Sequence, residues 1–246
     1  MKLYMHAGSL NHGCEAIVRS TVKLTGEEII LYSEHPEEDK LVHLDNICAV
    51  VKQGGKRDRM NPLFVLSKLA EVLLKRPNIK YRYVYNRVIK SVKPGELYLS
   101  IGGDNYCYGA NPYLMYVNRE LTRRGERTGL WGCSIEPDIL KDPEVVQDMK
   151  RYSFVSARET ITYHALKEAG VENVYFFPDP AFTLNSEQYD IDIPFPVKNV
   201  VGINLSPLVQ KLDKSGGLVM NNYIELINYI INDTDMIVVL IPHVCK

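Results

Sequence analysis

Short apolar, β-rich segments alternate with amphipathic segments along most of the chain. Residues 2–6 (KLYMH) form the first apolar run, and after a polar turn the apolar positions recur at three- and four-residue steps. That spacing predicts a helix over residues 14–24 with one buried stripe. The same pattern predicts strands over residues 28–32, 47–51, 96–101, 127–131, 154–157 and 174–177. It predicts helices between them over residues 62–74, 81–92, 112–124, 143–152 and 159–169.

Strands that alternate with helices at this spacing indicate crossover connections. They predict an α/β fold with a Rossmann-like, mostly parallel sheet. Residues 185–199 interrupt the rhythm, because they are first acidic and polar (NSEQYDID) and then rich in proline (IPFPVKN). This composition is typical of a linker.

After the interruption the alternation resumes with a strand, a helix and a strand over residues 200–204, 222–231 and 236–241. Three elements do not cover both faces of a parallel sheet. We therefore expect an N-terminal Rossmann-like domain over residues 1–184, a linker over 185–199 and the truncated start of a C-terminal Rossmann-like domain over 200–246. The alternative is that the last elements join the first sheet.

The overall charge and the cysteines indicate which partners and which cellular compartment to expect. A formal net charge of -1 gives no general reason to expect a nucleic-acid partner, and the short basic run Lys56, Arg57, Arg59 fits a solvated loop. The five cysteines are scattered and never spaced as CxxC, which favours a reducing compartment over a disulfide framework. The N-terminus has no long apolar segment, and the apolar stretch 236–242 is too short to cross a bilayer. We expect a cytoplasmic protein without a membrane span.

Unusual residues follow several predicted strands, and ligands of open parallel sheets bind beyond the carboxyl ends of the strands. These positions are residues 8–13, residues 102–105, residues 132–134, Arg158, Asp179 and residues 242–243. In the first loop, Gly8, Asn11, His12 and Gly13 would let the backbone approach an anion, or would form a plain turn in which Asn11 caps the helix. The dinucleotide fingerprint GxGxxG is absent from the chain, so a nicotinamide cofactor is not supported.

The second loop combines small, acidic and aromatic residues. Gly102 and Gly103 would open space above the sheet edge, or would form a turn that requires positive φ. Asp104 would hold a hydroxyl or cap a helix, and Asn105 lies beside it. The tyrosines that follow suit sugar rings as well as cores.

Arg158 and His243 are the candidate catalytic residues. An arginine after a strand is well placed to bind a carboxylate or phosphate, although it would equally pair with Glu159 or Glu136. His243 follows an apolar strand and would act as a general acid or base, unless it is a buried core histidine; His6 and His12 are its rivals. HxH, HExxH, GxSxG and Walker sequences are absent, so neither a metal site nor a hydrolase site is predicted.

Seven segments together resemble the polysaccharide pyruvyl transferase family. In chain order they are GSLNHGCEAIVRS, LSIGGDN, LWGCSIEP, VSARET, PDPAF, VVGINLSP and VLIPHV, and they span nearly the whole sequence. The resemblance implies a glycosyltransferase-B-like fold of two Rossmann-like halves. It implies phosphoenolpyruvate as the donor, with no cofactor and no essential metal. The acceptor would be a saccharide, free or lipid-linked, of a cell-surface polysaccharide or exopolysaccharide.

The resemblance also assigns the residues. Arg158 matches the donor-binding arginine of the segment SARE, and His243 matches the catalytic histidine after a late strand. The candidate substrate-binding residues are Gly8, Asn11, His12, Gly13, Gly102, Gly103, Asp104, Asn105, Ser134 and Asn204.

Family members continue well past the histidine, whereas three residues follow His243 here. We therefore expect these residues to be most of such an enzyme, with uncertain activity of their own. Two other functions remain open. One is a glycosyltransferase of the same fold with a nucleotide-sugar donor, and the other is a truncated, non-catalytic sugar-binding protein.

Overall fold

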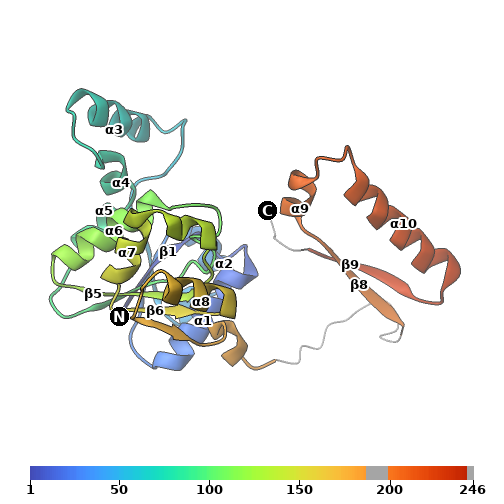
Figure 1. Cartoon of the computed structure of the whole chain (residues 1–246). Helices are drawn as coiled ribbons and strands as arrows, with labels where there is room; N and C mark the ends of the chain where they lie inside the picture. Colours follow the sequence, from blue (N-terminus) through green and yellow to red (C-terminus); the bar gives the residue numbers. More distant parts are fainter. Residues whose placement is uncertain (187–198, 243–246) are drawn as a thin grey trace. The chain divides into compact units, whose positions relative to one another are not determined.

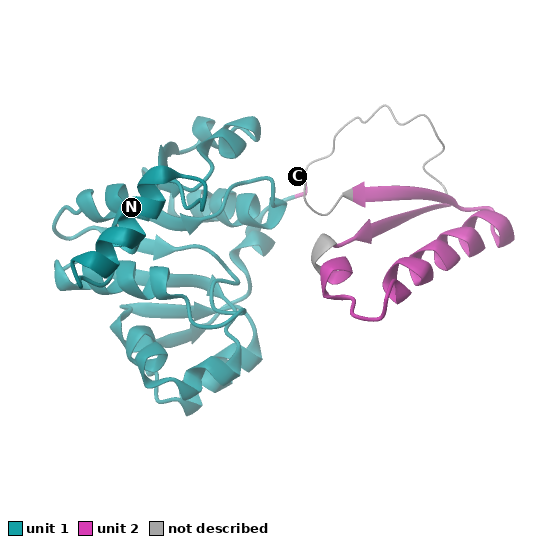
Figure 2. Cartoon of the chain, turned by 90° about the horizontal axis from the view of Figure 1, so that it is seen from above, with its two compact units in different colours: residues 1–185 teal, residues 186–246 magenta. Residues whose placement is uncertain are grey.

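The computed structural model describes residues 1–186 and 199–242, which divide into two compact units, residues 1–185 and residues 186–246 (Figures 1 and 2). The predicted catalytic residue His243 lies outside the described residues.

The first unit is built on a seven-stranded sheet in which every neighbouring pair of strands is parallel. The strand order is β3-β2-β1-β4-β5-β6-β7, so the chain changes direction across the sheet between β1 and β4. The α/β, Rossmann-like prediction is therefore confirmed. The strands are β1 Lys2–His6, β2 Ile30–Ser33, β3 Ala49–Lys52, β4 Leu97–Ser100, β5 Arg127–Cys133, β6 Phe154–Ala157 and β7 Val174–Phe176.

Helices connect these strands, and many begin where the sequence supplies a cap. Asn61, Asn111 and Asp142 each accept a hydrogen bond from a backbone N–H in the first turn of a helix that starts with proline. The helices are α1 His12–Thr25, α2 Pro36–Leu41, α3 Pro62–Leu73, α4 Ile79–Val84, α5 Asn86–Lys90, α6 Pro112–Arg123, α7 Pro143–Arg151 and α8 Thr160–Glu168. Short 3-10 helices are η1 Leu44–Asn46, η2 Pro137–Lys141 and η3 Pro180–Thr183.

One predicted helix is two. Residues 81–92 contain a break between α4 and α5, because residues 53–55 insert their backbone there. The Arg87 N–H donates to the Gln53 carbonyl at 3.2 Å, and the Gly55 N–H donates to the Tyr83 carbonyl at 3.0 Å. A Cβ on Gly54 would lie 2.1 Å from the Val84 carbonyl oxygen, so only glycine permits this approach.

Side chains alternate between two hydrophobic clusters, one on each face of the sheet. Leu3 packs in the same cluster as Ile17 of α1, whereas Tyr4 packs in the same cluster as Val117 of α6 and Met149 of α7. Consecutive residues of a strand point to opposite faces, so β1 contributes to both clusters. The sheet is thus buried between helices, as a parallel sheet requires.

The second unit contains a separate parallel pair of strands, β8 Val200–Leu205 and β9 Ile237–Pro242. Helices α9 Pro207–Leu212 and α10 Leu218–Asp233 connect them. These two strands pair with each other in a two-stranded sheet. None of the helices described is long and apolar enough to cross a membrane.

A candidate anion-binding site at the carboxyl ends of the strands

A hollow of about 470 Å³ opens at the carboxyl ends of the strands of the first unit. We call it the Arg158 pocket. It includes residues that follow five different strands, at the edge where parallel sheets bind ligands. Its lining residues are Asn11, Gly13, Cys14, Ile17, Gly103, Asp104, Cys107, Tyr108, Ser134, Arg158, Asp179 and Ala181.

Arg158 is held in this pocket by two side chains. Its Nε donates to Ser134 Oγ at 2.9 Å, and its Nη1 donates to Asp179 Oδ2 at 2.7 Å. The side chain is 27% exposed. Within residues 1–186 and 199–242, no hydrogen bond is recorded from its Nη2. The guanidinium is therefore oriented by the protein while part of its donor edge remains open to a ligand.

The sequence suggested Glu159 or Glu136 as partners of Arg158, but the ion pair is made with Asp179. The carboxylate of Glu159 is instead turned to the start of α8, where it accepts the Thr162 N–H at 3.0 and 3.1 Å. Helix capping thus keeps Glu159 away from the guanidinium.

The sequence placed Asp179 at a strand end but did not include it among the candidate substrate-binding or catalytic residues. Its Oδ1 accepts the Ala181 N–H at 2.9 Å while its Oδ2 accepts from Arg158, so it both begins η3 and positions the arginine. The feature of the sequence that pointed to Asp179 was its position after the last strand of the sheet. The turn that leads from β5 is close by, since a Cβ on Gly132 would lie 2.8 Å from Pro180 Cδ.

Neither Gly102 nor Gly103 adopts a positive φ. Their role is instead to leave space for neighbouring side chains. A Cβ on Gly103 would lie 2.6 Å from Arg158 Nη1, so the absence of a side chain at this position leaves space for the guanidinium. A Cβ on Gly102 would lie 1.9 Å from Asn105 Nδ2. The GGDN segment therefore makes room for Arg158 on one side and for Asn105 on the other.

The loop after β1 contributes Asn11 and Gly13 to the pocket. Asn11 caps α1, accepting the Gly13 N–H at 3.0 Å. Gly8 and His12 do not line the pocket. Gly8 has a φ of +107°, and a Cβ there would lie 2.2 Å from Glu38 Oε2, so glycine is needed for packing against α2. The His12 side chain is 59% exposed and its Nδ1 lies 3.1 Å from Glu15 Oε2.

A buried polar cluster fixes the start of this loop. His6 Nε2 lies 2.7 Å from Asp39 Oδ1, and Ser9 Oγ donates to the same carboxylate oxygen at 2.6 Å. Burial alone would raise the pKa of Asp39, but hydrogen bonding and charge from His6 outweigh it and lower that pKa. His6 reaches the cluster because Met5 adopts a φ of 65° at an irregularity in the β1–β2 pairing. His6 is thus a structural histidine.

Cys107 and Cys133 are poorly suited to act as nucleophiles. Burial, with the charge of Asp104, raises the pKa of the Cys107 thiol against the effect of Arg158. Burial raises the pKa of Cys133 to about 12. Both thiols stay protonated near neutral pH, and a thiol is a poor nucleophile compared with a thiolate.

The charges of the Arg158 pocket limit how much negative charge a bound ligand can carry. Arg158 supplies one positive charge, whereas Asp104 and Asp179 supply two negative charges. The first turn of the 14-residue helix α1 adds the favourable end of a helix dipole. These formal charges sum to -1, so a ligand with two anionic groups requires positive charge from elsewhere.

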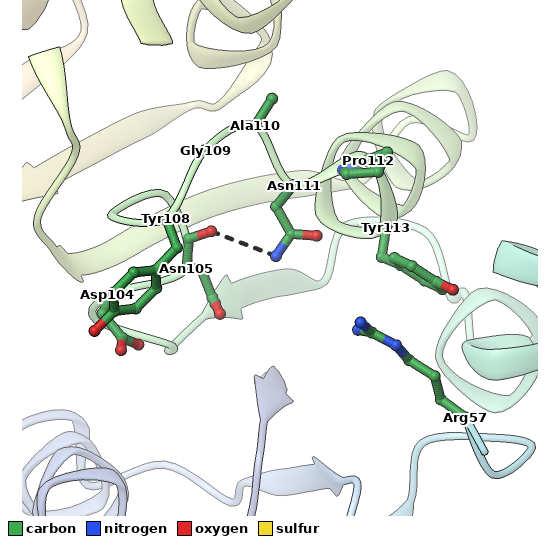
Figure 3. Close-up of a pocket in the computed structure, with 9 residues that line it drawn as sticks. All are labelled: Arg57, Asp104, Asn105, Tyr108, Gly109, Ala110, Asn111, Pro112 and Tyr113. Atoms are coloured by element: carbon green, nitrogen blue, oxygen red, sulfur yellow. Dashed lines mark hydrogen bonds between the residues drawn. The ribbon is translucent and has the colours of Figure 1, made fainter. Parts of the chain in front are cut away.

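A second hollow of about 370 Å³ adjoins the first, and Asp104 and Tyr108 line both (Figure 3). We call it the Arg57 pocket. Arg57 lies over the ring of Tyr113, 4.6 Å from its centroid, and its guanidinium points into the pocket (Figure 3). The lining residues are Arg57, Asp104, Asn105, Tyr108, Gly109, Ala110, Asn111, Pro112 and Tyr113.

Asn204 belongs to the second unit. Its Nδ2 donates to the Ile241 carbonyl at 3.0 Å, which links β8 to β9. Over the described residues, no group of three or more His, Cys, Asp and Glu side chains is arranged to hold a metal ion.

The family model described as "Polysaccharide pyruvyl transferase" matches residues 11–246, which is almost the entire chain. No curated protein matches the sequence.

Proposed function

The chain belongs to the polysaccharide pyruvyl transferase family and is therefore a transferase, and we propose that its donor is phosphoenolpyruvate. The product would be a pyruvate ketal on a sugar of a cell-surface polysaccharide or exopolysaccharide, made in the cytoplasm. The observation that carries this proposal is the oriented, partly open guanidinium of Arg158 in a pocket at the carboxyl ends of the strands.

Phosphoenolpyruvate presents a carboxylate and a phosphate, and Arg158 is suited to bind one of these groups through Nη2. Ser134 and Asp179 hold the guanidinium in place, so little conformational entropy is lost when the donor binds. The pocket's own charges do not balance both anionic groups. We infer that a cation outside this set, for which His243 is our candidate, accompanies the second group.

Ketal formation needs a proton at one carbon and two new bonds at its neighbour. Protonation of the enol methylene makes the adjacent carbon electrophilic, and one sugar hydroxyl attacks it. The phosphate then leaves and a second hydroxyl of the same sugar adds. Of the two hydroxyl protons, one replaces the proton taken up by the methyl group and the other leaves with the phosphate. A general acid and stabilisation of the leaving phosphate are required. We assign the first role, or the second, to protonated His243.

The Arg57 pocket is our candidate acceptor site. Asp104 stands in the wall that it shares with the Arg158 pocket, where a carboxylate would hold a sugar hydroxyl beside the donor. The rings of Tyr108 and Tyr113 supply flat apolar faces, and Asn105 and Asn111 supply amide groups. This combination suits a saccharide, as pockets with a few placed polar groups suit their ligands.

Thermal-shift titration separates this function from that of a nucleotide-sugar glycosyltransferase. We expect phosphoenolpyruvate to raise the melting temperature and nucleoside diphosphates to leave it unchanged, because a ligand stabilises only the state that binds it. The reverse result would favour the glycosyltransferase. A non-catalytic sugar-binding protein would bind saccharide without acceptor-dependent release of phosphate, so a phosphate assay completes the test.

A further inference from the structure

Helix α3 carries its apolar side chains outward. A surface helix ordinarily turns its apolar stripe to the core and its polar face to water. In α3 the buried residues are Phe64 and Ser67, while Leu73 is 79% exposed and Val72 is 75% exposed. We call the exposed apolar side chains of this helix and the residue after it the α3 face; they are Leu63, Val65, Leu66, Leu69, Val72, Leu73 and Leu74.

The opposite side of α3 is already occupied. It packs on α4, where Phe64 lies against Tyr83 with ring centroids 6.4 Å apart, and Glu71 pairs with Lys80 at 3.4 Å. Lys68, the only other charged residue of the helix, lies over the Phe64 ring. Rotating the helix to hide the α3 face would break these contacts. Figure 1 draws α3 at the end of a projection, with α4 between it and the body of the first unit.

Positive charge is concentrated around this face. Residues 56–90 contain ten Lys and Arg against Asp58 and Glu71, a net charge of +8 in a chain whose total is -1. Arg59 precedes the helix, and Lys75 and Arg76 follow it; all three are exposed. The apolar face is therefore bordered by cations at both ends of the helix.

We propose that the α3 face docks on an anionic lipid bilayer. An apolar helix face lying in the headgroup region, with Lys and Arg beside it, is the arrangement by which peripheral helices bind membranes. Each basic residue near an anionic surface adds to the attraction. A second copy of the chain is a poorer occupant, because it would bring one +8 segment against another. Docking here is independent of the proposed transferase function.

Co-sedimentation of the whole chain with vesicles tests the proposal. We expect binding to vesicles that contain phosphatidylglycerol, little binding to pure phosphatidylcholine, and release at high salt. The variant Leu66→Ser/Leu69→Ser/Leu73→Ser should bind vesicles at least about tenfold more weakly, because it removes apolar area that the bilayer would bury. The charge reversal Lys75→Glu/Arg76→Glu should weaken binding to a similar extent.

Matched controls change the same chemistry elsewhere on the first unit. The variant Leu24→Ser/Leu41→Ser/Ile161→Ser removes three exposed apolar side chains, and Lys40→Glu/Lys150→Glu reverses two exposed charges. Both should bind vesicles as the wild type does. Because all substituted residues are exposed, folding should persist, and the fluorescence of the single tryptophan, Trp131, checks it.

Two results would overturn the proposal. One is equal binding, or no binding, by the wild type and the α3-face variants. The other is a concentration-dependent dimer that only the α3-face variants lose, which would make the face an interface between copies of this chain.

Discussion

At the scale of single residues, the position of Arg158 depends on its neighbours as much as on its own strand. Ser134 and Asp179 accept two of its hydrogen bonds, and Gly103 leaves the space that its guanidinium occupies. Asp179 and Gly103 follow different strands and meet only in the folded sheet. Residues from three different loops thus position the guanidinium of one arginine.

We predict that Gly103→Ala weakens phosphoenolpyruvate binding by displacing Arg158, since the new Cβ would stand 2.6 Å from Nη1. A double-mutant cycle with Arg158→Ala measures whether the effect passes through the arginine. Once Arg158 is absent, the glycine substitution should have almost no further effect. Full additivity of the two losses in a calorimetric titration would show that Gly103 acts in another way.

A second prediction concerns His243. The variant His243→Gln should lower turnover sharply because glutamine cannot donate a proton as an imidazolium does, while most of the affinity for phosphoenolpyruvate persists. Steady-state phosphate release and donor binding, measured on the same preparation, separate the two effects. Turnover equal to that of the wild type would exclude the role assigned to His243.

The sequence predicted the residues at strand ends better than their partners. Arg158, Ser134 and Asp104 were identified because a parallel sheet brings strand ends together, and the structure brings them into one pocket. The pairing of Arg158 with Asp179 was not predicted, because adjacent Glu159 was the nearer partner in sequence. Local capping of α8 by Glu159 is a detail of backbone geometry that composition does not reveal.

At the scale of elements, the loop between β4 and α6 is held in place by hydrogen bonds to the buried carboxyl group of Asp148. Tyr106 OH donates to Asp148 Oδ2 of α7 at 2.7 Å, and Asn118 of α6 donates to Asp148 Oδ1 at 3.0 Å. Asp148 is completely buried. The loop that lines both pockets is therefore tied to two helices through one carboxyl group.

The anchor predicts a pH dependence of stability. Burial raises the pKa of Asp148, and the hydrogen bonds from Tyr106 and Asn118 offset it only in part. The folded state therefore holds this proton more tightly than the unfolded state does. Stability from this group is present below the ordinary carboxyl pKa of about 4 and is lost as pH rises through the raised pKa.

Urea unfolding of the wild type and of Asp148→Asn, followed between about pH 4 and pH 7, isolates this contribution. Asparagine does not titrate, so the wild type should lose unfolding free energy relative to the variant as pH rises. A difference that stays constant, or that changes in favour of the wild type, would contradict the raised pKa.

Elements with strong local signals were predicted well, and those set by distant contacts were not. The predicted starts of α6 and α7 match the structure, in which each helix begins with a proline that follows an Asn or Asp cap. The break between α4 and α5 was missed because it depends on Gln53 and Gly54, about thirty positions away in the chain. Helix α2 was missed because its sequence, PEEDKL, is short and mostly polar.

At the scale of the whole molecule, nearly all of the described residues with buried apolar side chains belong to the first unit. Among the buried apolar side chains of the described residues, only Ile203 and Ile230 lie in the second. We propose that the first unit, residues 1–185, is a domain that folds by itself. The two-domain glycosyltransferase-like architecture expected from the family stays a prediction.

A fragment of residues 1–185 tests this boundary. It contains Trp131, whose Nε1 donates to Thr21 Oγ1 at 3.0 Å, so its fluorescence reports packing of α1 on the sheet. We expect one cooperative urea transition with a midpoint close to that of the same probe in the whole chain. A fragment without a cooperative transition would show that the second unit is needed for the first to fold.

The central claim is that Arg158 binds the donor, and isothermal titration with phosphoenolpyruvate tests it most directly. Arg158→Ala should weaken binding by about ten- to hundredfold, as expected for the loss of hydrogen bonds between charged groups. Arg123→Ala, which removes an exposed arginine on α6, should bind as the wild type does. Equal affinities of the wild type and Arg158→Ala would contradict the account.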